Sequence, residues 1–119
     1  MAEERTHTGS CHCGNVKFEV TGDFTNVISC NCSMCSRTGA LLAFVPATQF
    51  KLLKGEDAQG TYRFNKHVID HLFCKNCGIR SFSKGVGPGG VEMRAINVRC
   101  LEGIDVDALQ IKKVDGRSR

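Results

Sequence analysis

The chain contains no tryptophan, one tyrosine and no apolar run close to the roughly 20 residues that a membrane-spanning helix needs. Its first residues, MAEERTHTGS, also lack the apolar stretch of a secretory signal. We therefore expect no membrane span and a cytoplasmic location. The length of 119 residues predicts a single domain, 1–119, whose ends at 1–6 and 115–119 are flexible.

The scarcity of large aromatic residues restricts how the hydrophobic core can be built. Val, Ile, Leu and seven Phe residues must supply it. A chain of this size buries an adequate but not generous core. Cross-links of some kind would therefore help to stabilise the fold.

A strong charge of one sign is absent as well. Sixteen Lys and Arg residues stand against twelve Asp and Glu residues, and the local excess is confined to the tail IKKVDGRSR at 111–119. Such a charge is too weak and too scattered for a nucleic-acid surface, so we do not expect a nucleic-acid partner. The mild positive field would nonetheless suit a small anionic ligand.

The apolar residues recur mostly with a period of two, which predicts a mainly β fold of short strands. VKFEV places Val16, Phe18 and Val20 on one face of a strand. LLAFV at 41–45 is a continuous apolar run and predicts a strand buried on both faces. Less regular alternation predicts further strands at 61–64, 68–73 and 91–98.

The connecting segments carry glycine and short helical patterns. KGVGPGG at 84–90 predicts a loop that joins two strands of a hairpin. Sustained helical periodicity is missing, except for one expected turn after Cys32 and a short stretch at 104–109, IDVDAL.

Cysteine is what the sequence has in abundance, with eight residues. In a reducing compartment, clustered cysteines bind metal or do chemistry more often than they form disulfides. They fall into three hooks and one isolated residue: a first hook of Cys11 and Cys13, a middle hook of Cys30, Cys32 and Cys35, a third hook of Cys74 and Cys77, and Cys100 alone.

Counting ligands divides the hooks between two zinc ions. The first and third hooks together supply four thiolates, which make one closed structural zinc site. The middle hook supplies three, which is typical of a catalytic site with one open position. Pairing the middle hook with either of the others would give five ligands and leave two cysteines unused. We therefore expect two zinc ions per chain.

Other side chains leave alternatives to this division open. Cys100 could complete the middle hook and make both sites structural, although lone cysteines are usually small buried hydrophobic residues. His12, His67 and His71 could also act as ligands, and His67 and His71 share one face of the predicted strand.

Three blocks of the sequence, GSCHCGNVKFEV, CNCSMCSRTGALLAFVP and FCKNCGIRSF, resemble the glutathione-dependent formaldehyde-activating enzyme family, which includes centromere protein V. The blocks stand in the family's order, and the resemblance covers most of residues 9–101. In this family the middle hook usually reads Cys-His-Cys, whereas here Asn31 stands between the cysteines. The resemblance implies a β-tent zinc fold of short antiparallel strands.

The same resemblance implies the roles of the cysteines. The structural zinc would be bound by Cys11, Cys13, Cys74 and Cys77, and the catalytic zinc by Cys30, Cys32 and Cys35. The family's named reaction adds glutathione to formaldehyde to give S-hydroxymethylglutathione.

These observations predict a zinc-dependent carbon–sulfur lyase whose partners are a small thiol such as glutathione and a small aldehyde. Arg37 and Arg80 follow the middle and third hooks and are candidates to pair with substrate carboxylates. One alternative is a non-enzymatic zinc module that binds protein or nucleic acid. Another is a thiol sensor that loses zinc on oxidation. The sequence leaves the oligomeric state open.

Overall fold

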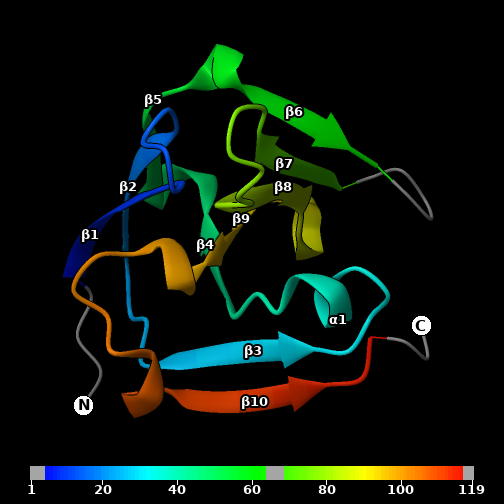
Figure 1. Ribbon diagram of the computed structural model, residues 1–119. Helices are drawn as coiled ribbons and strands as arrows, with labels where there is room; N and C mark the ends of the chain where they lie inside the picture. Colours follow the sequence, from blue (N-terminus) through cyan, green and yellow to red (C-terminus); the bar gives the residue numbers. More distant parts are fainter. Residues whose placement is uncertain (1–4, 64–68, 117–119) are drawn as a thin grey trace.

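The structure is a computed structural model that describes residues 5–63 and 69–116, and it folds these residues into two β-sheets (Figure 1). The strands are β1 (Arg5–Ser10), β2 (Lys17–Gly22), β3 (Asn26–Cys30), β4 (Leu42–Pro46), β5 (Phe50–Lys54), β6 (Gln59–Tyr62), β7 (Asp70–Cys74), β8 (Phe82–Val86), β9 (Glu92–Asn97) and β10 (Gln110–Val114). The helices are α1 (Cys35–Thr38) and the 3₁₀ turns Ala47–Gln49, Glu56–Ala58, Pro88–Gly90, Val98–Cys100 and Val106–Ala108.

The mainly β fold predicted from the sequence is confirmed. A small sheet has the strand order β1-β2-β5, and a large sheet has the order β10-β3-β4-β9-β8-β7-β6. Neighbouring strands are antiparallel except β3 and β10, which pair in parallel and lie together at the bottom of Figure 1. This parallel pair departs from the expectation of antiparallel strands throughout, because β10 reaches β3 from the far end of the chain rather than through a hairpin.

The core lies between the two sheets and is centred on three phenylalanines. The ring of Phe50 in β5 lies 4.5 Å from that of Phe82 in β8 and 5.4 Å from that of Phe18 in β2, measured between centroids. Offset aromatic contacts at these distances favour packing. The predicted alternation at 16–20 is confirmed, since Val16, Phe18 and Val20 are all buried.

The prediction that 41–45 is buried on both faces is wrong. Leu41, Ala43 and Val45 are buried, but the Phe44 side chain on the opposite face is 52% exposed. The apolar run therefore belongs to a strand with one face in the core and the other on a hollow described below. A continuous apolar run cannot distinguish these two situations, because both require hydrophobic side chains.

The remaining sequence predictions fall close to the observed elements. The glycine-rich segment joins β8 to β9, although its first residues, Lys84 to Val86, still belong to β8. Single helical turns are present at α1 and within 104–109. The predictions for residues 64–68, 1–4 and 117–119 lie outside the described residues, while Arg5 and Thr6 begin β1. Among the described residues, no helix is long and apolar enough to span a membrane.

Candidate functional site

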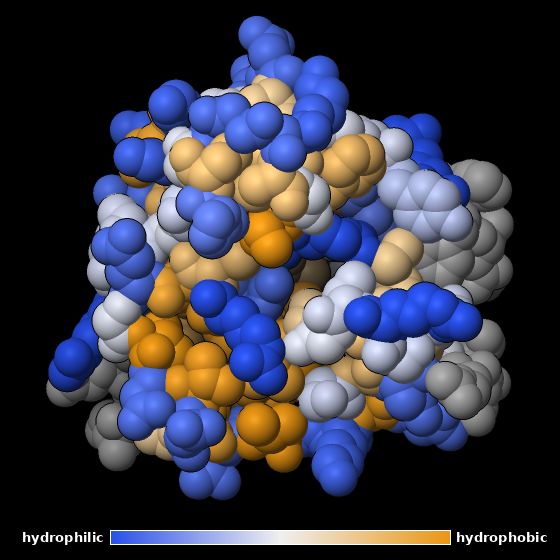
Figure 2. All heavy atoms as spheres, viewed as in Figure 1, coloured by the Kyte–Doolittle hydropathy of each residue, from blue (hydrophilic) through white to orange (hydrophobic). Residues whose placement is uncertain are grey.

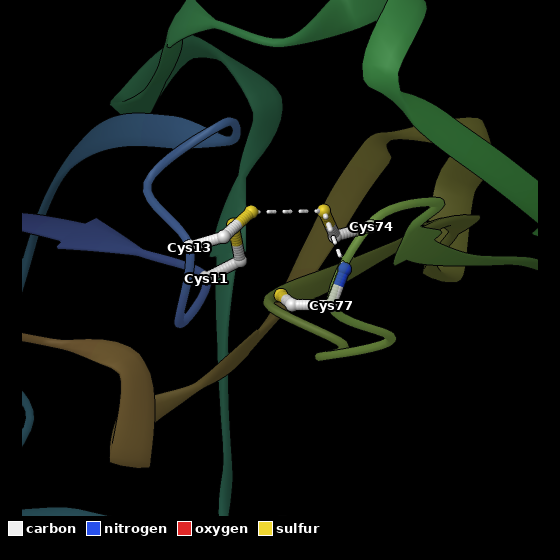
Figure 3. Close-up of side chains that lie close together, drawn as sticks. All are labelled: Cys11, Cys13, Cys74 and Cys77. Carbon is white, nitrogen blue, oxygen red and sulfur yellow. Dashed lines mark hydrogen bonds between the residues drawn. The ribbon is translucent and has the colours of Figure 1, made fainter.

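The first and third hooks come together as one cluster of four cysteines, called here the closed cluster (Figure 3). Cys11 and Cys13 lie in the turn after β1, and Cys74 and Cys77 lie at the end of β7 and in the turn that follows. The Sγ atom of Cys13 is 3.7 Å from that of Cys11 and 3.6 Å from that of Cys74. Tetrahedral bonds of about 2.3 Å to zinc imply sulfur separations near 3.8 Å, whereas a disulfide bond is only about 2.0 Å long. The spacing therefore fits four ligands around one metal ion.

The backbone of each hook turns so that N–H groups point at the sulfur atoms. Val16 donates an N–H to Sγ of Cys11 at 3.3 Å, and Cys77 donates one to Sγ of Cys74 at 3.5 Å. Gly14 and Gly78, each directly after a hook, have φ near +80°, which a residue with a side chain rarely adopts. Donors of this kind stabilise thiolates and orient them for a metal.

The middle hook forms a second group, called here the open cluster. Cys30 ends β3, Cys35 begins α1, and Cys32 lies in the turn between them, with the three sulfur atoms within 4.8 Å of one another. Cys32 donates its N–H to Sγ of Cys30 at 3.5 Å, and Cys35 donates its N–H to Sγ of Cys32 at 3.3 Å. Within the described residues, no further Cys, His, Asp or Glu joins this group.

Within each cluster the thiols differ in how readily they ionise. Burial, together with the neighbouring thiols, raises the pKa of Cys35 to about 12. Burial also opposes ionisation of Cys32, but N–H donation from Cys35 and contact with the adjacent thiols leave its pKa below the usual value. In the closed cluster, backbone donors at Cys13 and Ile79 lower the pKa of Cys77 to about 6.

The alternative ligands considered above lie elsewhere. Cys100 is half-buried beside Ser81 and Cys77, on the side of the closed cluster, and it belongs to neither group. His12 lies between two ligands of the closed cluster without joining it. His67 lies outside the described residues.

The open cluster borders a chamber of about 280 Å³, which α1, β4, β7, β8 and β9 surround. Figure 2 shows a hollow near the centre of its face, just above the position of α1 in Figure 1. The chamber is lined by Cys32, Met34, Cys35, Thr38, Ala40, Leu42, Phe44, Ile69, His71, Arg80, Phe82, Ser83, Ala95 and Asn97. A larger hollow of about 490 Å³ beside β1 contains none of the cysteines.

Among the described lining residues of this chamber, Arg80 and His71 are the basic ones. The guanidinium of Arg80 donates to Sδ of Met34, and it lies close enough to the thiols of Cys35 and Cys32 to be influenced by their charge. Burial, and then the positive charge of Arg80, lowers the pKa of His71. An anion entering the chamber would thus meet a fixed positive charge next to the cysteines.

Arg37, the other predicted arginine, does not line the chamber. Its guanidinium donates to the carbonyl oxygen of Ser33 at 2.8 Å. It borders a separate hollow of about 250 Å³ together with Ser33, Met34 and Tyr62. Met34 lines both this smaller hollow and the chamber.

Sequence reasoning missed the contribution of the C-terminal strand to the open cluster. The N–H of Asn31 donates to the carbonyl oxygen of Val114 at 3.1 Å, which continues the pairing of β3 with β10. A Cβ atom at Gly116 would lie 2.5 Å from Sγ of Cys30 and 3.3 Å from Cβ of Cys32. Gly116 therefore packs directly against the cluster, and no local pattern in the sequence indicates this contact.

Comparison with known proteins identifies relatives of this arrangement. The family model of the glutathione-dependent formaldehyde-activating enzyme matches residues 6–110. A crystal structure of a Rhodobacter sphaeroides protein, solved as a structural-genomics target, is similar with a TM-score of 0.76 and 29% sequence identity. The match covers 88% of this chain and 99% of that one.

Proposed function

The chain belongs to the glutathione-dependent formaldehyde-activating enzyme family, and on that premise we propose that it is a zinc-dependent carbon–sulfur lyase acting on adducts of a small thiol with a small aldehyde. The observation that carries this proposal is the open cluster, in which three cysteines can hold a metal and leave one position for a substrate. Two of them, Cys32 and Cys35, line the chamber. Glutathione and formaldehyde are the substrates that the family name suggests.

The donor chemistry of both clusters supports zinc as the metal. Four thiolates at tetrahedral spacing suit a closed structural zinc at Cys11, Cys13, Cys74 and Cys77. Three thiolates suit a zinc site with an exchangeable fourth position. When bound there, zinc would act as a Lewis acid toward a substrate sulfur or carbonyl oxygen.

In the proposed reaction, the thiol sulfur bonds to the carbonyl carbon of the aldehyde, and the carbonyl oxygen ends as a hydroxyl that carries the proton lost by the thiol. The reverse reaction breaks the same carbon–sulfur bond and returns the proton to sulfur. Arg80 would hold the substrate through an anionic group, and His71, kept neutral by its lowered pKa, can accept the thiol proton. Holding both reactants in one chamber supplies proximity.

A reducing, cytoplasmic location is part of the proposal. All eight cysteines are free thiols, and seven of them form the two clusters. Oxidising surroundings would convert such clustered thiols to disulfides and so remove the ligands.

The proposal is tested by measuring zinc content and catalysed exchange on the same preparation. We expect about two zinc ions per chain. We also expect faster exchange between free formaldehyde and its glutathione adduct than in buffer with the same free zinc. A variant with Arg80→Gln should exchange more slowly while keeping both zinc ions.

Failure of the exchange reaction with several thiols and aldehydes, in protein that holds two zinc ions, would contradict the lyase. It would favour the non-enzymatic zinc module instead. Reversible loss of one zinc ion under mild peroxide, again without exchange activity, would favour the thiol sensor.

A further inference from the structure

A second hollow of about 390 Å³ lies beside the chamber, along β8 and β9. Phe44, Ile69, Ser83 and Ala95 line both spaces, so the two hollows adjoin at these four residues. The second hollow is called here the apolar hollow. Its further lining residues are Lys84, Gly85, Val86, Gly87, Pro88 and Met93.

The apolar hollow leaves large hydrophobic side chains open to solvent. Phe44 is 52% exposed, Ile69 44% and Val86 68%. Exposed apolar side chains that line a hollow are typical of a ligand site, because covering them removes apolar surface from water. Among its described lining residues, Lys84 is the one that carries a charge, and most of the others are apolar or glycine. Most of the hollow therefore offers no partner to a carboxylate or a peptide group.

The two reactants of the proposed reaction differ in what they would place in this hollow. Glutathione carries two carboxylates and two peptide groups, which suit the chamber, where Arg80 supplies a positive charge. Formaldehyde has no substituent at all and would leave the apolar hollow filled with water. An aldehyde with a hydrocarbon substituent would cover the exposed side chains.

We propose that the aldehyde carries an apolar chain of several carbons that lies in the apolar hollow, so that adducts of such aldehydes are preferred to that of formaldehyde. This inference rests on the proposed lyase function. The bond changes are those of the proposed lyase: the carbon–sulfur bond of the adduct breaks, its hydroxyl becomes the aldehyde carbonyl, and the hydroxyl proton passes to the thiol sulfur. The apolar chain takes no part in the bond changes and only binds.

Binding is measured by calorimetry on the zinc-loaded protein, with two thioethers that mimic the adducts and cannot be cleaved. S-hexylglutathione carries the apolar chain, and S-methylglutathione does not. Each methylene that leaves water contributes about a fourfold gain in affinity. We expect S-hexylglutathione to bind at least about tenfold more tightly, since three buried methylenes would already exceed that value.

Two variants test whether the apolar hollow is responsible. Val86→Asn and Met93→Gln each place a polar side chain in the lining and should bring the affinity for S-hexylglutathione toward that for S-methylglutathione. Val91→Asn is the matched control, because Val91 is 49% exposed in the same hairpin but does not line the hollow. Melting temperatures confirm that all three variants are folded.

The outcomes separate this inference from the function on which it rests. Equal affinity of the wild-type protein for the two thioethers, or no binding of either, overturns the inference that the aldehyde carries an apolar chain. Rapid exchange of formaldehyde together with equal affinity overturns the inference and leaves the lyase intact. A hexyl preference that Val86→Asn removes, in protein that turns over neither formaldehyde nor hexanal adducts, supports the hollow and contradicts the lyase.

Discussion

The two cysteine clusters use the same ligand chemistry but differ in how far apart their cysteines lie in the sequence. The closed cluster joins Cys13 to Cys74, which are 61 residues apart, whereas the open cluster gathers residues 30–35 within a single turn. Two members of the closed cluster, Cys11 and Cys74, are buried in the core, while all three members of the open cluster are partly accessible. Ligands that are distant in sequence and partly buried suit a metal that stabilises the fold. Ligands that are close in sequence and accessible suit a metal that binds a substrate.

This difference leads to unequal effects when a ligand is removed. Binding energy at a metal site that forms only in the folded chain is folding energy. A closed loop also restricts the unfolded chain more when its ends are far apart in sequence.

Cys74→Ser should have the largest effect. The buried serine would weaken the metal site that ties the turn after β1 to β7, and the modest core has little stability in reserve. We expect no cooperative thermal transition, or a very large drop in melting temperature, measured by circular dichroism. Cys100→Ser is the control, because Cys100 is half-buried but belongs to neither cluster, and this variant should keep both zinc ions.

Cys32→Ser should leave a folded protein. We expect about one zinc ion per chain by atomic emission, a melting temperature close to that of the wild type, and no thiol–aldehyde exchange. If Cys32→Ser unfolds the chain while Cys74→Ser melts normally, the structural and catalytic assignments are reversed.

Gly116→Val should disturb the open cluster without replacing any of its cysteines. The added side chain would press on Sγ of Cys30, so we expect zinc affinity at this site to fall about 10- to 100-fold, the range typical of groups that support metal ligands. A competition assay with a coloured chelator measures this loss. Gly85→Ala is the control, since its Cβ would meet only Ile69 at an ordinary distance of 3.7 Å. Unchanged zinc affinity in Gly116→Val would show that the C-terminal segment does not support the cluster.

Substitutions of Asn31 should have the smallest effect. Asn31 is exposed, and its backbone N–H bonds to Val114, so we expect a role in holding the turn. Asn31→Asp keeps a side chain that favours turns and should reduce exchange less than Asn31→Val. The reverse order in initial rates would favour an electrostatic role, because Asp adds negative charge beside an anionic site.

Local patterns in the sequence were enough to predict the strand at 16–20 and the grouping of the cysteines into four and three. Alternation reports directly on burial, and a metal requires a fixed number of thiolates. The exposure of Phe44 was not predictable, because an apolar side chain that lines a hollow looks the same in sequence as one in a core. The pairing of β3 with β10 was not predictable either, since parallel pairing across the chain depends on tertiary structure rather than on local preference.

The contact between Gly116 and the open cluster has a consequence for the order of events during synthesis. A chain emerges from the ribosome with its N-terminal part first. The last ligand of the closed cluster is Cys77, so that site can load its metal while the C-terminal strand is still being made. The thiols of the open cluster are synthesised earlier, but Gly116, which packs against them, is synthesised after both clusters. These thiols are therefore synthesised well before the backbone that packs against them, and the open cluster is complete only once Gly116 has been added.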